Sequence, residues 1–413
     1  MDILEVFQEM VSTGQPPNEG CSIIGVGYED AFSRLERTYL QNFFQKGKSA
    51  EKFIIGPYGS GKTHFLRQLL EVGRKNDCAV AEVPLSMNID ITKLLVVYKE
   101  VARVITLPDQ KRRGIEALIK TSLNRISSKY DDPDTVSDFI ESWIDGLEEN
   151  DFEHDGFRRV LTRTLRSMLK GEQEIFDAGC QWLAGEVTDK NIAKILNVNQ
   201  IPAAEQDGFG RRAMFSLCQF IKAAGYTGTI IGFDEAEQAT NVPLKQRKRI
   251  QSMTRSELDI ITKIKDASLL VVYAFTPDVI DEMRNYPALQ QRVAEPDPTR
   301  RFFDGNDYSP RIDLDQLIQH TEGGSIEILQ KIGERLVNLL YDQYGNKLPI
   351  EKDQIITLCN DWANDIEIRN ASIGNRRDMV KLTCSRLLHL YNHGTVEGAP
   401  DIQPSSNPGD EEV

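Results

Sequence analysis

The stretch FIIGPYGSGKTHFLRQLL (53–70) decides the fold of this chain. Its apolar start predicts a short buried strand, and the apolar residues that recur at helical spacing near its end predict a helix. Between them, GPYGSGKT (56–63) matches the phosphate-loop pattern GxxxxGK followed by Ser or Thr. Glycines let backbone N–H groups approach phosphate oxygens closely, and the helix directs the positive end of its dipole at the same place. The stretch therefore predicts a nucleotide-binding α/β domain.

The residues of this loop have distinct expected roles in holding a nucleotide. Lys62 is expected to reach the β- and γ-phosphates, and Thr63 is expected to give its hydroxyl to Mg²⁺. The expected cofactors are therefore ATP and Mg²⁺. The predicted nucleotide-binding residues of the stretch are Gly56, Pro57, Tyr58, Gly59, Ser60, Gly61, Lys62, Thr63 and His64.

A second predicted strand ends in two carboxylates. The segment GTIIGFDEAEQ (228–238) has an apolar run that stops at Asp234 and Glu235. In proteins with a phosphate loop, an Asp in this position holds the Mg²⁺ shell, and a neighbouring Glu can polarise the attacking water. The alternative is a strand that ends in a solvated acidic turn. The loop upstream favours the catalytic pair.

A third predicted strand, within ASLLVVYAFTPDVIDEM (267–283), ends in polar residues. Thr276 would lie near the γ-phosphate if this strand neighbours the loop strand, and it would then sense the phosphate or the attacking water. The alternative is that Thr276 caps the helix that follows.

Composition narrows the class of protein. The chain has 413 residues and a net charge of −14, with six scattered cysteines and no close Cys pair. This pattern favours reduced thiols over a disulfide framework or a zinc site. The start, MDILEVFQEM, has neither the basic residues nor the apolar run of a signal peptide, and no stretch is long and apolar enough to span a bilayer. We expect a cytoplasmic protein with no membrane partner.

The chain contains two basic segments, although its net charge is negative. They are FRRVLTRTLRSMLK (157–170) and PLKQRKRIQSMTR (243–255), and neither contains an acidic residue. The second run directly follows the acidic strand and is a candidate contact for double-stranded DNA. The equal alternative is an interface with another protein. The residues of that candidate contact are Lys245, Arg247, Lys248 and Arg249.

The order of these parts resembles an AAA+ ATPase of the origin-recognition type. A box-like segment, GVGYEDAFSRLERTYL (25–40), precedes the phosphate loop, and a helical region containing GNRR (374–377) ends the series. More narrowly, the chain resembles the BrxC/BrxD family, P-loop proteins of the bacterial BREX phage-defence systems. The segments that carry this likeness are IIGPYGSGKTHFLRQL (54–69), WLAGE (182–186), GYTGTIIGFDEAEQ (225–238) and YPALQQR (286–292).

The resemblance implies an AAA+ P-loop NTPase core with a helical insertion and a C-terminal helical lid. It also implies slow ATP hydrolysis and a nucleotide state, ATP or ADP, that controls self-association or assembly with DNA or other defence proteins. Two alternatives are a nucleotide-gated scaffold with little hydrolysis and a DNA-loading ATPase of the replication or transposition type. The implied roles are adenine contact for Val26 and Tyr28, first sensor for Thr276, arginine finger for Arg292, and second sensor for Arg376 or Arg377.

The pattern along the chain predicts its division into parts. Apolar stripes bounded by turn signals make 109–225 almost wholly helical, which indicates an insertion into the ATPase core. The last residues, rich in Pro, Ser, Gly and acids, predict disorder. The expected parts are an N-terminal segment (1–24), the first part of the core (25–108), the insertion (109–225), the second part of the core (226–318), the lid (319–394) and the acidic tail (395–413).

Overall fold

The structure is a computed structural model that divides the chain into two compact units. Unit 1 comprises Met1–Arg34, Phe53–Val72 and Ala274–Val413, and unit 2 comprises Leu35–Lys52 and Gly73–Tyr273. The unit boundaries fall within two strands, β1 (Ala50–Ile55) and β4 (Leu269–Phe275). The structure describes residues 2–85, 89–108, 110, 112–129, 133–236, 260–278, 301–319, 323–369 and 375–400.

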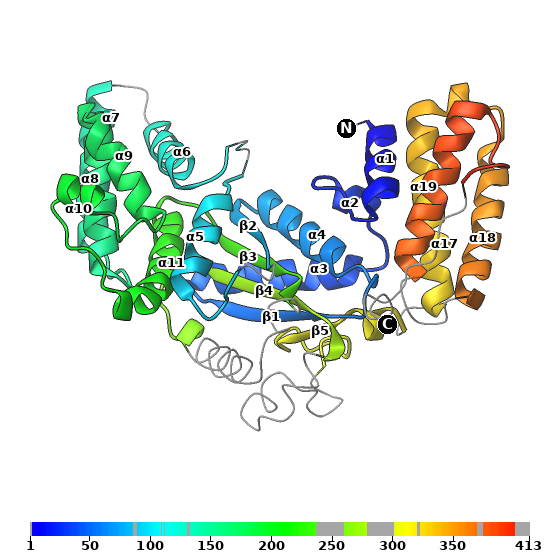
Figure 1. The fold of residues 1–413 in the computed structure, drawn as a ribbon, viewed down its shortest axis with the longest axis horizontal. Coiled ribbons are helices and arrows are strands. Elements are labelled where there is room, and N and C mark those ends of the chain that lie inside the picture. Colours follow the sequence, from blue (N-terminus) through cyan, green and yellow to red (C-terminus); the bar gives the residue numbers. More distant parts are fainter. Residues whose placement is uncertain are drawn as a thin grey trace. The chain divides into compact units, whose positions relative to one another are not determined.

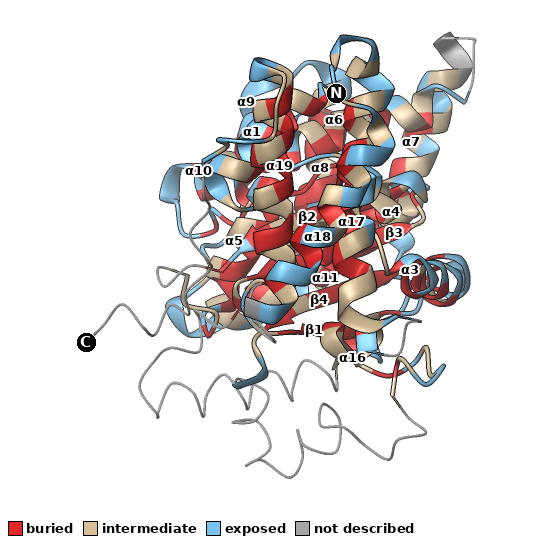
Figure 2. Cartoon of the chain, turned by 90° about the vertical axis from the view of Figure 1, so that its right-hand side faces the viewer, coloured by how far each residue is buried: buried red, intermediate tan, exposed pale blue. Residues whose placement is uncertain are grey.

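A five-stranded sheet has the order β2-β3-β4-β1-β5. Its other strands are β2 (Cys78–Pro84), β3 (Gly228–Asp234) and the short β5 (Arg311–Asp313). The pairs β2–β3, β3–β4 and β1–β5 are parallel. Every residue of β3 is buried, which is typical of a parallel strand covered on both faces, and the buried colour predominates in the strands labelled in Figure 2. The predicted α/β fold with a parallel sheet is confirmed.

Unit 1 surrounds its strand residues with helices from both ends of the chain. Its last three helices pack on one another, and α1 lies along α19 (Figure 1). Their contact is apolar, with Leu336, Leu340 and Leu387 fully buried. The helices are α1 (Ile3–Thr13), α2 (Cys21–Ile24), α3 (Glu29–Leu35), α4 (Lys62–Lys75), α16 (Leu314–Gln319), α17 (Gly324–Tyr344), α18 (Lys352–Arg369) and α19 (Asn375–His393).

Unit 2 carries the helices of the region predicted as an insertion. Helices α5 and α11 contact β2 and β3, and α7, α8, α9 and α10 pack in sequence on one another. Phe209 anchors this region, with its ring edge-on to Trp182 at 5.2 Å and to His154 at 4.9 Å. The helices are α5 (Leu94–Val104), α6 (Ile115–Ser127), α7 (Pro133–Glu149), α8 (Asp155–Lys170), α9 (Gln173–Leu183), α10 (Lys190–Leu196) and α11 (Gln206–Ala223), with the π-helix η1 (Glu36–Phe43) and the short 3-10 helices η2 (Phe44–Lys46) and η3 (Ala203–Glu205).

Candidate nucleotide site

The loop 56–63 joins β1 to α4 in unit 1, and its glycines have conformations that other residues rarely adopt. Gly59 and Gly61 have φ of 74° and 90°, in the left-handed region. Gly56 leaves no room for a side chain, because a Cβ there would lie 2.3 Å from the Ser60 Oγ. The N–H of Gly56 donates to the Phe275 carbonyl at the end of β4 (3.3 Å). The loop is therefore a tight turn fastened to the neighbouring strand.

Lys62 bends back over this loop. Its Nζ donates to the carbonyls of Gly56 (3.0 Å) and Pro57 (3.2 Å). Thr63 follows in the first turn of α4, and the nearby Ser60 Oγ is buried without a hydrogen-bond partner among the described residues. A tight loop, a helix N-terminus, an ammonium group and an unsatisfied buried hydroxyl together fit a nucleotide polyphosphate.

Arg376, in the first turn of α19, contacts the same loop within unit 1. Its Nη1 donates to the Tyr28 hydroxyl (2.6 Å) and to the Ser60 carbonyl, and its Nη2 forms an ion pair with Asp315. The guanidinium therefore links α19 to the loop 56–63, to the box-like segment and to α16.

Arg377 takes a different position. Its guanidinium carbon lies over the Tyr58 ring, 5.6 Å from the centroid, and its Nη2 donates to the Thr13 carbonyl at the end of α1 (3.4 Å). Both arginines that the sequence leaves as alternatives for the second sensor contact the loop 56–63, Arg376 through the Ser60 carbonyl and Arg377 through the Tyr58 ring. The sequence pattern alone does not distinguish Arg376 from Arg377 for the role of second sensor, which stays a prediction.

The box-like segment packs on the helix that follows the loop. Tyr28 is buried with its ring edge-on to Phe65 (5.2 Å), and Val26 is half-buried nearby in the chain. The Glu71 carboxylate accepts from the N–H groups of Cys21 and Ser22, both at 2.8 Å, at the start of α2. These bonds fix α2 and the segment after it against α4.

His64 occupies the third position of α4, directly after Thr63. Burial lowers the pKa of its imidazole to about 4, although the Glu71 carboxylate acts in the opposite direction. Within the part of the chain that the structure describes, the buried His64 Nε2 and Gln68 Oε1 lack a well-formed hydrogen bond, and both lie close to Gly25, where a Cβ would be 2.8 Å and 2.2 Å from them. Gly25 therefore lets the box-like segment close directly onto α4.

Asp315 belongs to this site and was not predicted from the sequence. The segment RIDLDQL (311–317) contains a three-residue strand followed at once by α16, so Asp315 lies just beyond the end of β5. Burial raises the pKa of the Asp315 carboxyl, whereas Arg376 and then Lys62 lower it. A pattern of two acids at the end of a short strand is the signal that could have identified it.

The acidic pair ends β3 in unit 2. Asp234 is buried as the last residue of the strand, and its carbonyl accepts from the Leu85 N–H (2.9 Å). Glu235 has φ of 54°, a left-handed conformation that is uncommon for a residue with a side chain. Such backbone strain at the end of a strand is frequent in functional sites.

Thr276 directly follows β4 and is half-buried. In the sheet order, β4 lies next to β1, the strand that enters the phosphate loop. Phe275 stacks on Phe53 of β1, with centroids 6.1 Å apart. A sensor role for Thr276 requires that its strand lies next to the loop strand. The sheet order meets this requirement, and the role itself stays a prediction.

Several predicted residues lie outside the described residues. They are Arg292, the basic residues Lys245, Arg247, Lys248 and Arg249, and the end of the acidic tail (401–413). Their roles remain predictions.

The first basic run, in contrast, is described as part of α8. Arg166 pairs with Glu141 (3.4 Å), Asp145 (2.6 Å) and Glu148 of α7. Arg163 donates to the carbonyls of Leu196 and Ile195 (3.3 Å to the latter) at the end of α10. Arg158 and Arg159 both pair with Asp155, Arg159 at 3.1 Å. This run holds the helices of unit 2 together through pairs within its own fold.

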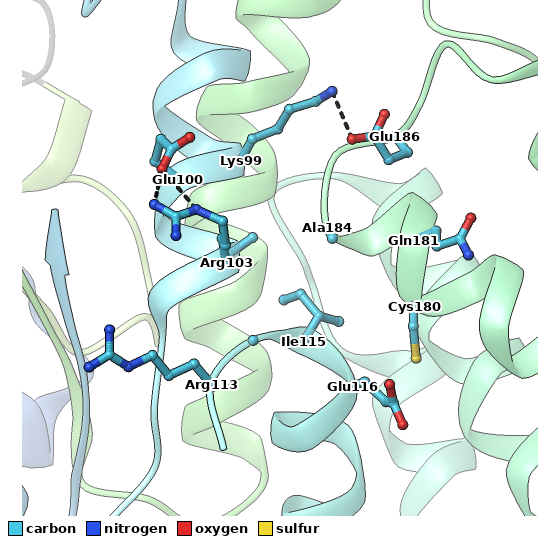
Figure 3. A pocket seen from close by; sticks show the side chains of 12 residues that line it. Lys99, Glu100, Arg103, Arg113, Ile115, Glu116, Cys180, Gln181, Ala184 and Glu186 are labelled. Carbon is cyan, nitrogen blue, oxygen red and sulfur yellow. Dashed lines mark hydrogen bonds and ion pairs between the residues drawn. The ribbon is translucent and has the colours of Figure 1, made fainter. Parts of the chain in front are cut away.

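Unit 2 also contains a pocket of about 510 Å³ between α5, the start of α6 and the end of α9 (Figure 3). Its charges are balanced and largely paired, with Lys99 bonded to Glu186 (3.1 Å) and Arg103 to Glu100 (2.5 Å). Within the described ranges, no cluster of His, Cys, Asp or Glu could hold a metal ion, and no helix has the length and apolar character to cross a membrane. The pocket therefore has no evident chemical function.

Comparison with known proteins identifies the family. No curated protein and no solved structure matches the chain. The family described as BREX system ATP-binding protein BrxC/D matches residues 5–403. That match covers the loop 56–63, strand β3 and helices α17, α18 and α19, whose geometry is given above. The chain therefore belongs to the BrxC/BrxD family of BREX system ATP-binding proteins.

Proposed function

We propose that this protein binds ATP·Mg²⁺ at the loop 56–63, hydrolyses the nucleotide slowly and uses its nucleotide state to control assembly in BREX defence. The observation that carries the proposal is the position of Arg376. A lid arginine that contacts the Ser60 carbonyl of the phosphate loop can report to the lid whether the loop holds phosphates. The family's description as ATP-binding supports the same site.

The proposed roles follow from charge and position. Lys62 would leave the Gly56 and Pro57 carbonyls and bind the β- and γ-phosphates. Thr63 would hold Mg²⁺ together with Asp234, and Arg376 would stabilise the charge of the γ-phosphate. Bound Mg²⁺ neutralises phosphate charge in this chemistry.

The proposed hydrolysis depends on Glu235. A carboxylate directly after the metal-binding Asp can accept a proton from the attacking water. The strained backbone at Glu235 supports this role, because a left-handed residue redirects the side chain relative to the regular strand. Thr276 would hold the same water or the γ-phosphate from the end of the neighbouring strand.

Two substitutions separate binding from chemistry. Lys62→Ala should abolish the charge contact with the phosphates and severely weaken ATP binding in calorimetry, and Lys75→Ala at the far end of α4 is the matched control. Glu235→Gln should still bind ATP but hydrolyse it at least about tenfold more slowly. Unchanged affinity in Lys62→Ala would refute the loop assignment, and unchanged turnover in Glu235→Gln would refute the catalytic carboxylate.

Assembly with other defence proteins, self-association and contact with double-stranded DNA are further parts of the proposal. Mass measurement with and without ATP and duplex DNA tests them directly. A nucleotide-gated scaffold would bind ATP with negligible turnover. A DNA-loading ATPase would leave phage plating efficiency unchanged when the gene is removed from among its neighbours.

A further inference from the structure

Asp315 forms an ion pair with Arg376, the cation that is proposed to bind the γ-phosphate of the nucleotide. Its carboxylate forms an ion pair with the Arg376 Nη2, and the two side chains are only 34% and 14% exposed. The other terminal nitrogen of the guanidinium, Nη1, donates to the Tyr28 hydroxyl and the Ser60 carbonyl. Both terminal nitrogens of Arg376 are therefore engaged by groups of the protein.

The same carboxylate also lies in the field of the loop lysine. Arg376 and Lys62 both lower the pKa of Asp315, against burial and the nearby Asp313, which raise it. Lys62 itself is bonded to the Gly56 and Pro57 carbonyls. The two cations proposed to bind the phosphates thus share one half-buried carboxylate, that of Asp315, as a neighbour.

We propose that Asp315 is a counter-ion that competes with the nucleotide phosphates for Arg376. In this inference, which rests on the proposed function, binding exchanges the Asp315–Arg376 pair for a phosphate–Arg376 pair. Three of the five N–H groups of the guanidinium donate to the Tyr28 hydroxyl, the Ser60 carbonyl and Asp315, and the exchange occurs where the phosphate takes the Nη2 position held by Asp315. A phosphate that takes the Nη2 edge displaces the carboxylate.

The exchange has two physical consequences. The displaced Asp315 repels the incoming phosphate, so it lowers nucleotide affinity relative to a neutral residue at this position. It also breaks the pair that joins α16 to the first turn of α19, so phosphate binding loosens one lid contact as it forms another. Asp315 therefore couples the occupancy of the loop to the lid.

The test compares Asp315→Asn with the wild type in the 413-residue chain. Asp315→Asn should raise affinity for ATP by about tenfold, because it removes a negative charge beside the phosphates while keeping the side-chain shape. In the Arg376→Gln background the gain in affinity should be smaller, because only the direct repulsion by Asp315 is then removed and no cation is released to the phosphates. Asp353→Asn, an exposed carboxylate in the first turn of α18, is the control and should leave affinity unchanged.

A second measurement needs no nucleotide. Hydrogen exchange of the α19 first turn should become faster in Asp315→Asn than in the wild type, because the ion pair that holds this turn is lost. Unchanged or weaker ATP binding in Asp315→Asn would overturn the inference, and so would unchanged exchange. A wild type that binds no ATP would instead refute the proposed function, while the exchange measurement would still test the Asp315–Arg376 pair.

Discussion

His64 should make the helix of the phosphate loop sensitive to acid. Burial lowers the pKa of its imidazole from 6.5 to about 4 in the folded protein. The unfolded chain therefore binds a proton at a higher pH than the folded chain, and stability falls as the pH drops below about 6.5. The loss is complete once the pH lies below the folded pKa. Replacing His64 with Gln, which has similar reach but does not titrate, should remove this component.

The expected size follows from the two pKa values. Between pH 8 and pH 5 the wild type should lose about 2 kcal/mol more stability than His64→Gln, because each pKa unit of separation is worth about 1.4 kcal/mol. Hydrogen exchange of peptides from α4, measured at both pH values, gives the opening free energy of this helix. Other titrating groups are common to both proteins and cancel in the comparison. Equal pH dependence in the two proteins would show that His64 is not held neutral by burial.

Three further predictions concern the site and its partners. Arg376→Ala should weaken ATP binding by at least about tenfold, because a charge-assisted hydrogen bond contributes about 1.5–3 kcal/mol, whereas Arg377→Ala should change it little in calorimetry. Arg292→Ala should bind ATP but lose turnover, and mixing it with Glu235→Gln should restore part of the activity if the arginine acts in a neighbouring subunit; no rescue at any ratio would contradict that role. Replacing the four candidate basic residues of the run 243–255 with Ala should flatten the slope of log duplex affinity against log salt by about two to four, and an unchanged slope would exclude nucleic-acid contact.

The phosphate loop was predictable because its constraint is local. Gly59 and Gly61 must adopt left-handed backbone conformations, and Gly56 must accept a close approach, so the residue types themselves record the geometry. The parallel sheet was predictable for a related reason, since continuous apolar runs such as β3 indicate strands covered on both faces. Asp315 was not predictable in the same way. Its role depends on an arginine 61 residues away in the chain, and no local pattern encodes that pairing.

The basic run in α8 also shows that a local sequence pattern does not reveal contacts between distant parts of the chain. A run of arginines without acidic residues forms a positive surface only if no acidic residues of neighbouring helices or strands pair with it. In α8 this condition is not met, because Arg166 meets three carboxylates of α7 and Arg163 meets carbonyls at the end of α10. Composition along one helix therefore cannot distinguish a surface for an anionic partner from a structural hub.

Helix α2 is bonded both to α4, which follows the phosphate loop, and to α17, one of the C-terminal helices. Glu71 of α4 binds the N–H groups at the start of α2, and Arg335 of α17 donates to the Ile23 carbonyl near its end (2.6 Å). Gly27, just beyond α2, has no side chain, and a Cβ there would lie 2.5 Å from Ile328 of α17. The segment expected to contact adenine thus contacts α4, the helix that carries Lys62, and also contacts α17. We expect a shift of α4 to strain the contacts between α2 and α17, because α4 and α17 both bond to the same short helix. The bond from Arg376 to the Ser60 carbonyl is a second, separate link between the C-terminal helices and the loop 56–63.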